Sequence, residues 1–131
     1  IAYGLAPDFP SIDPRHITRS YGDFWMLGMS ATGRRGRKFF DQLVHADWTA
    51  AIADDIYQAP TMHYLGGEPI FIGDPRDQRT GAIICQVCDA AHMTSAFALF
   101  NAFHVAGGPV AMLHLREPIP PLFHASFHRG E

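Results

Sequence analysis

The sequence predicts a single α+β domain in which a mainly antiparallel sheet is covered by two main helices. Its 131 residues, 47% hydrophobic and 12% aromatic, are enough to build one core without disulfide bonds. Short apolar runs bounded by glycine and proline are typical of strands. Two longer segments repeat apolar residues at three- and four-residue steps, as amphipathic helices do.

The chain is expected to have three parts. Residues 1–22 contain three prolines and few periodic apolar positions, which predicts an extended arm over the core. Residues 23–117 are expected to form the α+β core domain, and residues 118–131 a C-terminal tail.

The first half of the core starts with a short aromatic run. Asp23–Met29 is predicted to be a buried strand. The apolar repeat of Phe39–Gln58 predicts the first helix, ending before a proline. Thr61–Leu65 and Pro69–Ile72 flank Gly66-Gly67-Glu68, a composition that favours a tight hairpin.

The second half of the core continues with a charged turn at Asp74–Thr80 and a strand at Ala82–Val87. The second helix is expected to run from Asp89, a good N-cap residue, to Val105, and the glycines and proline that follow would stop it. Val110–Leu115 is predicted to be a further strand.

The second predicted helix has a wide apolar face. At 100° per residue Met93, Phe97, Phe100 and His104 fall on one line. We interpret these four residues as the wall of a ligand pocket, and simple core packing is the alternative.

Both cysteines lie in one short motif, Cys85-x-x-Cys88-x-x-x-His92, whose spacing allows metal binding. Structural zinc needs a fourth ligand. It would have to come from His63, His114, His124 or His128.

The same motif is also compatible with two roles that involve no metal. Residues three apart on a regular strand point to opposite faces, so Cys85 and Cys88 converge only if the strand has turned. They could instead be inert core cysteines, or a thiol–disulfide pair with Cys85 as nucleophile and Cys88 as resolving thiol.

Charge and composition exclude some classes of function. Ten Lys and Arg against 13 Asp and Glu give a net charge of −3, so nucleic-acid binding is not expected. No apolar run approaches the roughly 20 residues of a membrane-spanning helix. Two cysteines so close together suggest a reduced pair, and a cytoplasmic location is expected.

A basic run at residues 33–38 precedes the first predicted helix and could attract an anion. The sequence contains no P-loop, nucleophile elbow, H-E-x-x-H or dinucleotide motif. It therefore offers no complete catalytic signature.

The segment from Gly36 to Trp48, with its glycine, apolar pair and Leu43-Val44-His45, resembles a stretch of PAS sensor domains. This resemblance implies an α+β sheet around a small cavity, in a sensory or dimerising module.

The sequence thus favours a non-catalytic module that senses a small ligand or associates with protein. Such a module could form a homodimer. The first alternative is a thiol–disulfide or zinc protein centred on Cys85, Cys88 and His92. The second is an accessory subunit of a larger assembly. Expected partners are a small molecule or a protein, and zinc is the one cofactor suggested.

Overall fold

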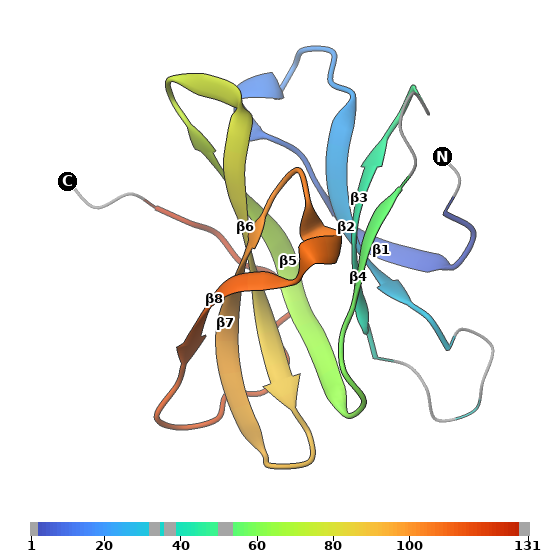
Figure 1. Cartoon of the computed structure of the whole chain (residues 1–131), viewed down its shortest axis with the longest axis vertical. Coiled ribbons are helices and arrows are strands. Elements are labelled where there is room, and N and C mark those ends of the chain that lie inside the picture. Colours follow the sequence, from blue (N-terminus) through green and yellow to red (C-terminus); the bar gives the residue numbers. More distant parts are fainter. Residues whose placement is uncertain (1–2, 32–34, 36–38, 50–53, 129–131) are drawn as a thin grey trace.

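The computed structural model describes residues 3–31, 35, 39–49 and 54–128, and this part of the chain forms two four-stranded antiparallel sheets (Figure 1). The first sheet contains β1 (Ala6–Ser11), β2 (Asp23–Met29), β3 (Gln42–Asp47) and β4 (Asp55–Gln58). The second sheet contains β5 (His63–Asp74), β6 (Asp77–Asp89), β7 (Thr94–Asn101) and β8 (Pro109–His114). The helical elements described are the short 3-10 turns η1 (Pro14–His16) and η2 (Val105–Gly107).

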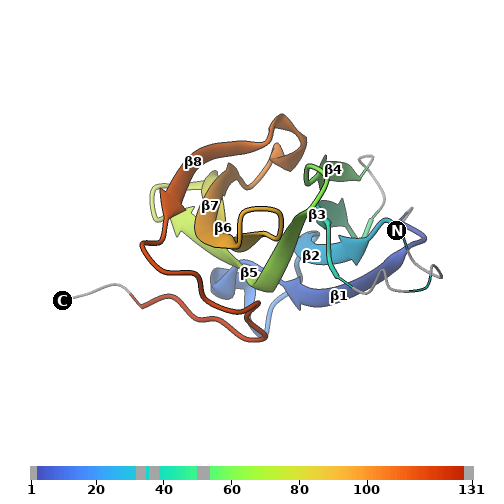
Figure 2. The same ribbon diagram turned by 90° about the horizontal axis from the view of Figure 1, so that it is seen from below.

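Each sheet is a meander in which every strand pairs with the next one along the chain. Successive four-stranded meanders are the repeating unit of β-propellers. The first strands of the two sheets, β1 and β5, lie in contact, as Figure 2 shows. We call this place the β1/β5 junction.

The prediction of a first helix at Phe39–Gln58 is wrong, because the described residues of this segment form β3 and β4. Residues 50–53 lie outside the described part. The strand β3 is buried on both faces, with Leu43 on one side and Val44 on the other. A strand buried on both faces has no period-two pattern, and its apolar run imitates a helix.

The prediction of a second helix at Asp89–Val105 is also wrong. The segment forms the β6–β7 turn, β7 and the start of η2. The Asp89 carboxylate accepts hydrogen bonds from the N–H groups of Ala91 and His92, at 2.9 and 3.1 Å. This is the bonding that the side chain would provide at a helix N-cap, and here it closes a turn instead.

The structure contains three of the predicted strands. Asp23–Met29 is confirmed as β2, and Ala82–Val87 lies within β6. The segment Val110–Leu115 overlaps β8. The hairpin expected around residues 66–68 is wrong, since β5 continues through them with an irregular register between Gly66 and Ile70.

The main core lies between the two sheets. Trp25 of β2 is fully buried there, stacks on Phe71 with ring centroids 4.7 Å apart, and donates from Nε1 to the Ala102 carbonyl at 2.7 Å. Burying a large ring together with its N–H group requires such a partner. This residue therefore joins the sheets through both apolar and polar contacts.

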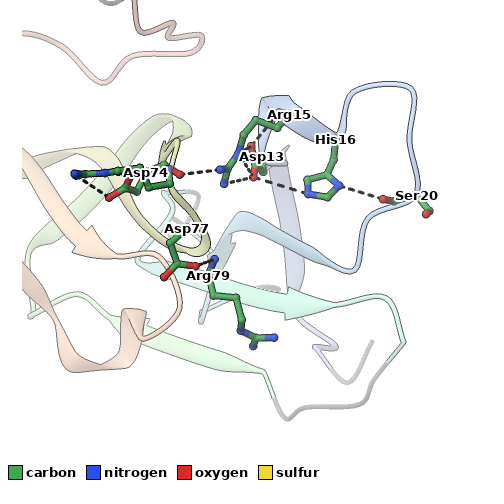
Figure 3. A network of polar contacts seen from close by, with 8 residues as sticks. Asp13, Arg15, His16, Ser20, Asp74, Asp77 and Arg79 are labelled. Carbon is green, nitrogen blue, oxygen red and sulfur yellow. Dashed lines mark hydrogen bonds and ion pairs between the residues drawn. The ribbon is translucent and has the colours of Figure 1, made fainter.

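Two carboxylates also join the sheets. Asp13 binds the Arg15 guanidinium at 2.7 Å, and Arg15 donates to the Asp74 carbonyl at 2.9 Å, so η1 is tied to the β5–β6 hairpin (Figure 3). Asp55 of β4 accepts from the N–H groups of Val105 and Ala106 at 2.6 and 2.9 Å. These links fix the relative position of the sheets.

Some sequence predictions concern the ends and the loops. The segment 1–22 contributes β1 to the first sheet. Apart from Arg35, the basic run at 33–38 lies outside the described residues. Over the described ranges, no helix has the length and apolar character needed to cross a membrane.

Candidate functional site

The tail that follows β8 crosses the face of the second sheet that is turned away from the core. Its anchors are Ser95 on β7, Gln86 on β6 and Gly67 on β5, in that order along the tail. Figure 2 shows the tail leaving β8, running beneath β5 toward β1 and then turning back. The tail thus reaches the β1/β5 junction.

Hydrogen bonds to side chains replace strand pairing in this tail. Three of the five residues at 118–122 are proline and have no N–H group, so this segment cannot pair as a regular strand. The N–H of Ile119 donates to Ser95 Oγ at 3.0 Å, and the N–H of Leu122 donates to Gln86 Oε1 at 2.7 Å. Every backbone donor from 118 to 122 is therefore satisfied.

The tail brings His124 beside Glu68 of β5. Nδ1 of His124 lies 3.0 Å from Glu68 Oε1, while 78% of the histidine side chain is exposed. Within the described residues, Nε2 of this ring makes no hydrogen bond. Phe9 of β1 contacts the ring edge-on, with centroids 6.2 Å apart. The carboxylate favours the tautomer with a proton on Nδ1 and leaves the Nε2 lone pair directed outward.

This arrangement is the one that metal-binding histidines use, in which a carboxylate orients the ring and raises its basicity. Other histidines also pair with carboxylates. His45 lies 2.8 Å from Asp23, but its ring is buried in the first sheet. His92 is 2.6 Å from Asp89, three residues before it in the same turn. The pair at His124 differs because it joins the tail to the β1/β5 junction.

The predicted cysteine motif is not assembled into a site. Cys85 faces the core, where burial raises its pKa to about 12, and its thiol contacts the Gly66 carbonyl at 3.7 Å. Cys88 lies on the opposite face, where burial raises its pKa and a hydrogen bond with Ser95 opposes that rise. His92 is bonded to its own turn. No group of three metal-binding side chains occurs in the part of the chain that the structure describes.

The four residues predicted to line a pocket do not share a face. Met93 is 72% exposed in the β6–β7 turn. Phe100 is fully buried in the core, and Phe97, three residues away on β7, points to the other face. His104 precedes η2, with its Nδ1 4.0 Å from Asp55.

The fold and the site together define a protein built from four-stranded sheets that presents a carboxylate-held histidine where two sheets meet. The chain belongs to the RPE65 family, described as retinal pigment epithelial membrane protein, whose family model matches residues 2–129. Comparison with curated protein sequences gives no significant match.

Several solved structures share the fold. Lignostilbene dioxygenase of Pseudomonas brassicacearum is 22% identical with a TM-score of 0.79, over 92% of this chain and 26% of that one. The Trp149Ala mutant of Synechocystis apocarotenoid oxygenase is 21% identical with a TM-score of 0.82, over 96% and 26%. A cobalt-substituted form of the Synechocystis protein matches with the same values. The chain thus spans about a quarter of the length of these proteins.

The family corrects two predictions made from the sequence. The PAS resemblance is wrong, because the family model covers nearly the whole chain and its fold is all β. The prediction of a non-catalytic sensor is contradicted, since the chain belongs to the RPE65 family. A metal cofactor is consistent with the family, and among the described residues the cysteines are not part of any group of three metal-binding side chains.

Sequence reasoning named His124 as a possible fourth ligand but missed the residues that hold it. Glu68 was placed inside a hairpin, and Gln86 and Ser95 were not singled out. A signal was present in Gln86, a polar residue in the apolar run of β6, because a buried amide needs partners.

Proposed function

We propose that this chain is the part of an RPE65-family oxygenase that supplies one histidine, His124, to a metal centre. The observation that carries the proposal is the 3.0 Å contact between His124 Nδ1 and Glu68. That contact favours the tautomer with the proton on Nδ1, which would leave Nε2 as the ligand atom.

The residues present fit such a centre only in part. One imidazole comes from the described residues, which hold no cluster of three ligands, so the remaining ligands would come from other parts of the protein. The solved neighbour in which 92% of this chain matches 26% is about three and a half times as long, which leaves room for these ligands. Imidazole ligands suit first-row metals, and iron is the one expected for an oxygenase. Such a metal, when bound, supplies the binding and activation of dioxygen.

The substrate we propose is an apolar, conjugated compound of the class to which stilbenes and apocarotenoids belong. The names of the structural neighbours suggest this class. Phe9 and Phe123 pack together beside His124, with centroids 5.8 Å apart. A half-open pocket of about 770 Å³ lies further along β5 and the tail, and its lining includes the apolar Ile70, Ile72 and Phe127 and the polar Asp13, Arg15 and His128. The apolar side chains would bind an apolar substrate and exclude water from it.

The test compares two histidines in the complete polypeptide. His124→Ala is expected to remove the bound metal and to abolish oxygen uptake with a stilbene and with an apocarotenoid. His92→Ala is the matched control, because His92 is also held by a carboxylate at Nδ1 and is 77% exposed. It should keep both properties. Metal content by elemental analysis and oxygen uptake provide the readouts, and stoichiometric metal in His124→Ala would refute the ligand assignment.

A further inference from the structure

Gln86 combines burial with bonding to the tail. Its side chain, on β6, is only 2% exposed. Its Nε2 donates to the Pro120 carbonyl at 3.0 Å, and its Oε1 accepts from the Leu122 N–H at 2.7 Å. The nitrogen and the oxygen of the amide are therefore both bonded to the tail, at two residues that are separated by one residue.

The surroundings of Gln86 are shaped for this contact. Gly66, its pairing neighbour on β5, has no side chain, and a Cβ there would lie 2.7 Å from Gln86 Oε1 and 3.2 Å from the Leu122 nitrogen. A larger residue would displace the end of the Gln86 amide, and the Leu122 nitrogen would also have to move by a few tenths of an ångström. The missing side chain at Gly66 thus lets the tail approach the sheet closely.

Leu122 connects Gln86 to the histidine site. Its N–H is bonded to Gln86, and its carbonyl accepts from the Gly67 N–H at 2.7 Å. Gly67 directly precedes Glu68, and Leu122 stands two residues before His124. One tail residue is therefore bonded to the sheet close to both partners of the His124–Glu68 pair.

A purely structural role would be to satisfy a polar group in the sheet. The partners of Gln86 indicate that it also positions the tail, since both are backbone groups of the tail and neither belongs to a strand. Apolar contacts alone would let the proline-rich segment slide, whereas paired donor and acceptor contacts fix one register.

We propose that Gln86 is a positioning residue for the metal centre, which fixes the register of the tail so that His124 faces Glu68. The proposal rests on the proposed function, because it assigns His124 as a ligand. It makes metal affinity depend on a side chain that touches neither the metal nor the histidine.

The experiment uses the complete polypeptide, freed of metal and titrated with Co²⁺, whose visible spectrum reports the coordination geometry. Gln86→Leu removes both hydrogen bonds, while Gln86→Glu keeps the acceptor at Leu122 and serves as the conservative variant. Gln78→Leu, an exposed position on the same strand, is the matched control. Val44→Ala, in the core of the first sheet, controls for general loss of stability.

Gln86→Leu should weaken Co²⁺ binding about tenfold and alter the spectrum, as loss of an outer-shell partner does. Hydrogen exchange at Leu122 and Gly67 should become at least about fivefold faster. Gln86→Glu should fall between Gln86→Leu and the wild type, and both controls should bind Co²⁺ normally.

Two outcomes would overturn the proposal, and they can be told apart. If Gln86→Leu loosens the Leu122 amide but leaves Co²⁺ affinity and spectrum unchanged, Gln86 only anchors the tail. If Val44→Ala weakens Co²⁺ binding as much as Gln86→Leu does, the effect is one of stability. The proposed function fails separately, when His124→Ala binds Co²⁺ with the affinity of the wild type.

Discussion

The two sheets differ in the face that each turns away from the shared core. In the first sheet this face is apolar and buried, and its centre consists of Phe24, Met26, Val44 and Ala46. In the second sheet the corresponding face carries Gln86, Ser95 and Cys88 beside apolar residues such as Phe97, and the tail lies over it. Apolar contacts stabilise without direction, whereas hydrogen bonds specify which residue lies opposite which. The first face therefore contributes stability, and the second positions a functional group.

The strongest test of this difference is to truncate the apolar face. Phe24 is 3% exposed and stacks on Trp48 with centroids 4.7 Å apart. Phe24→Ala should lower the free energy of unfolding by about 3–5 kcal/mol, because it removes buried surface and leaves a cavity. Chemical denaturation measures this loss.

The same variant should leave the second sheet undisturbed. The native-state register of the tail does not depend on Phe24, so the Leu122 amide should stay hydrogen-bonded and metal content should not change. A Phe24→Ala protein that folds but lacks metal would show that the two faces are not independent.

A smaller effect is expected where the sheets are joined. Asp13 is 8% exposed and binds Arg15 through a 2.7 Å ion pair and further hydrogen bonds. Asp13→Asn should cost about 1.5–3 kcal/mol, the usual range for hydrogen bonds to a charged group. The comparison is made with Asp77→Asn, whose carboxylate in Figure 3 bonds within its own hairpin and should matter less.

The contribution of Asp13 should also depend on pH. Burial alone would raise the pKa of Asp13, but hydrogen bonds from Arg15 and its charge hold that pKa below the usual value. A lowered pKa means that the stabilisation is complete near neutral pH and is lost as the pH falls through the folded-state value. The stability difference between wild type and Asp13→Asn should shrink below about pH 4. A difference that is constant from pH 7 to pH 3 would contradict this role.

The sequence predicted several strands correctly but not the fold class, for a physical reason. Asp23–Met29 is confirmed as β2: periodicity cannot separate strand from helix in so short a run, but its seven residues have the length of a strand and are fewer than a typical helix needs. The two false helices arose where strands are buried on both faces or are followed by a capped turn. The Asp89 side chain accepts the backbone hydrogen bonds expected at a helix N-cap, but a turn offers it the same N–H donors.

The candidate site was harder to predict, since it depends on contacts between distant parts of the chain. His124 and Glu68 are 56 residues apart, and nothing local to either residue indicates the other. The feature that could have been predicted from the sequence was the way the tail is held. Its prolines remove backbone donors, so a segment of this kind that packs on a sheet must be held by side chains of that sheet.

The smallest expected effect concerns the cysteines, which report on the two faces of the second sheet. Cys85 faces the core with its pKa raised by burial to about 12, and Cys88 lies beside Pro118 and Pro120 of the tail. At pH 8 Cys85 should stay unreactive toward a thiol reagent until the protein unfolds, because little thiolate forms. Cys88 is half-buried and should react in the folded protein, though slowly, since burial raises its pKa.

Release of the tail should increase the difference in reactivity between these two thiols. In Gln86→Leu, labelling of Cys88 should become faster while Cys85 stays protected, because the change opens only the face covered by the tail. Labelling rates at each cysteine, followed by mass spectrometry with the urea-unfolded protein as reference, measure the difference. Equal acceleration at both cysteines would mean that the tail contributes to the core rather than only covering the outer face of the sheet. The two faces would then not have separate roles.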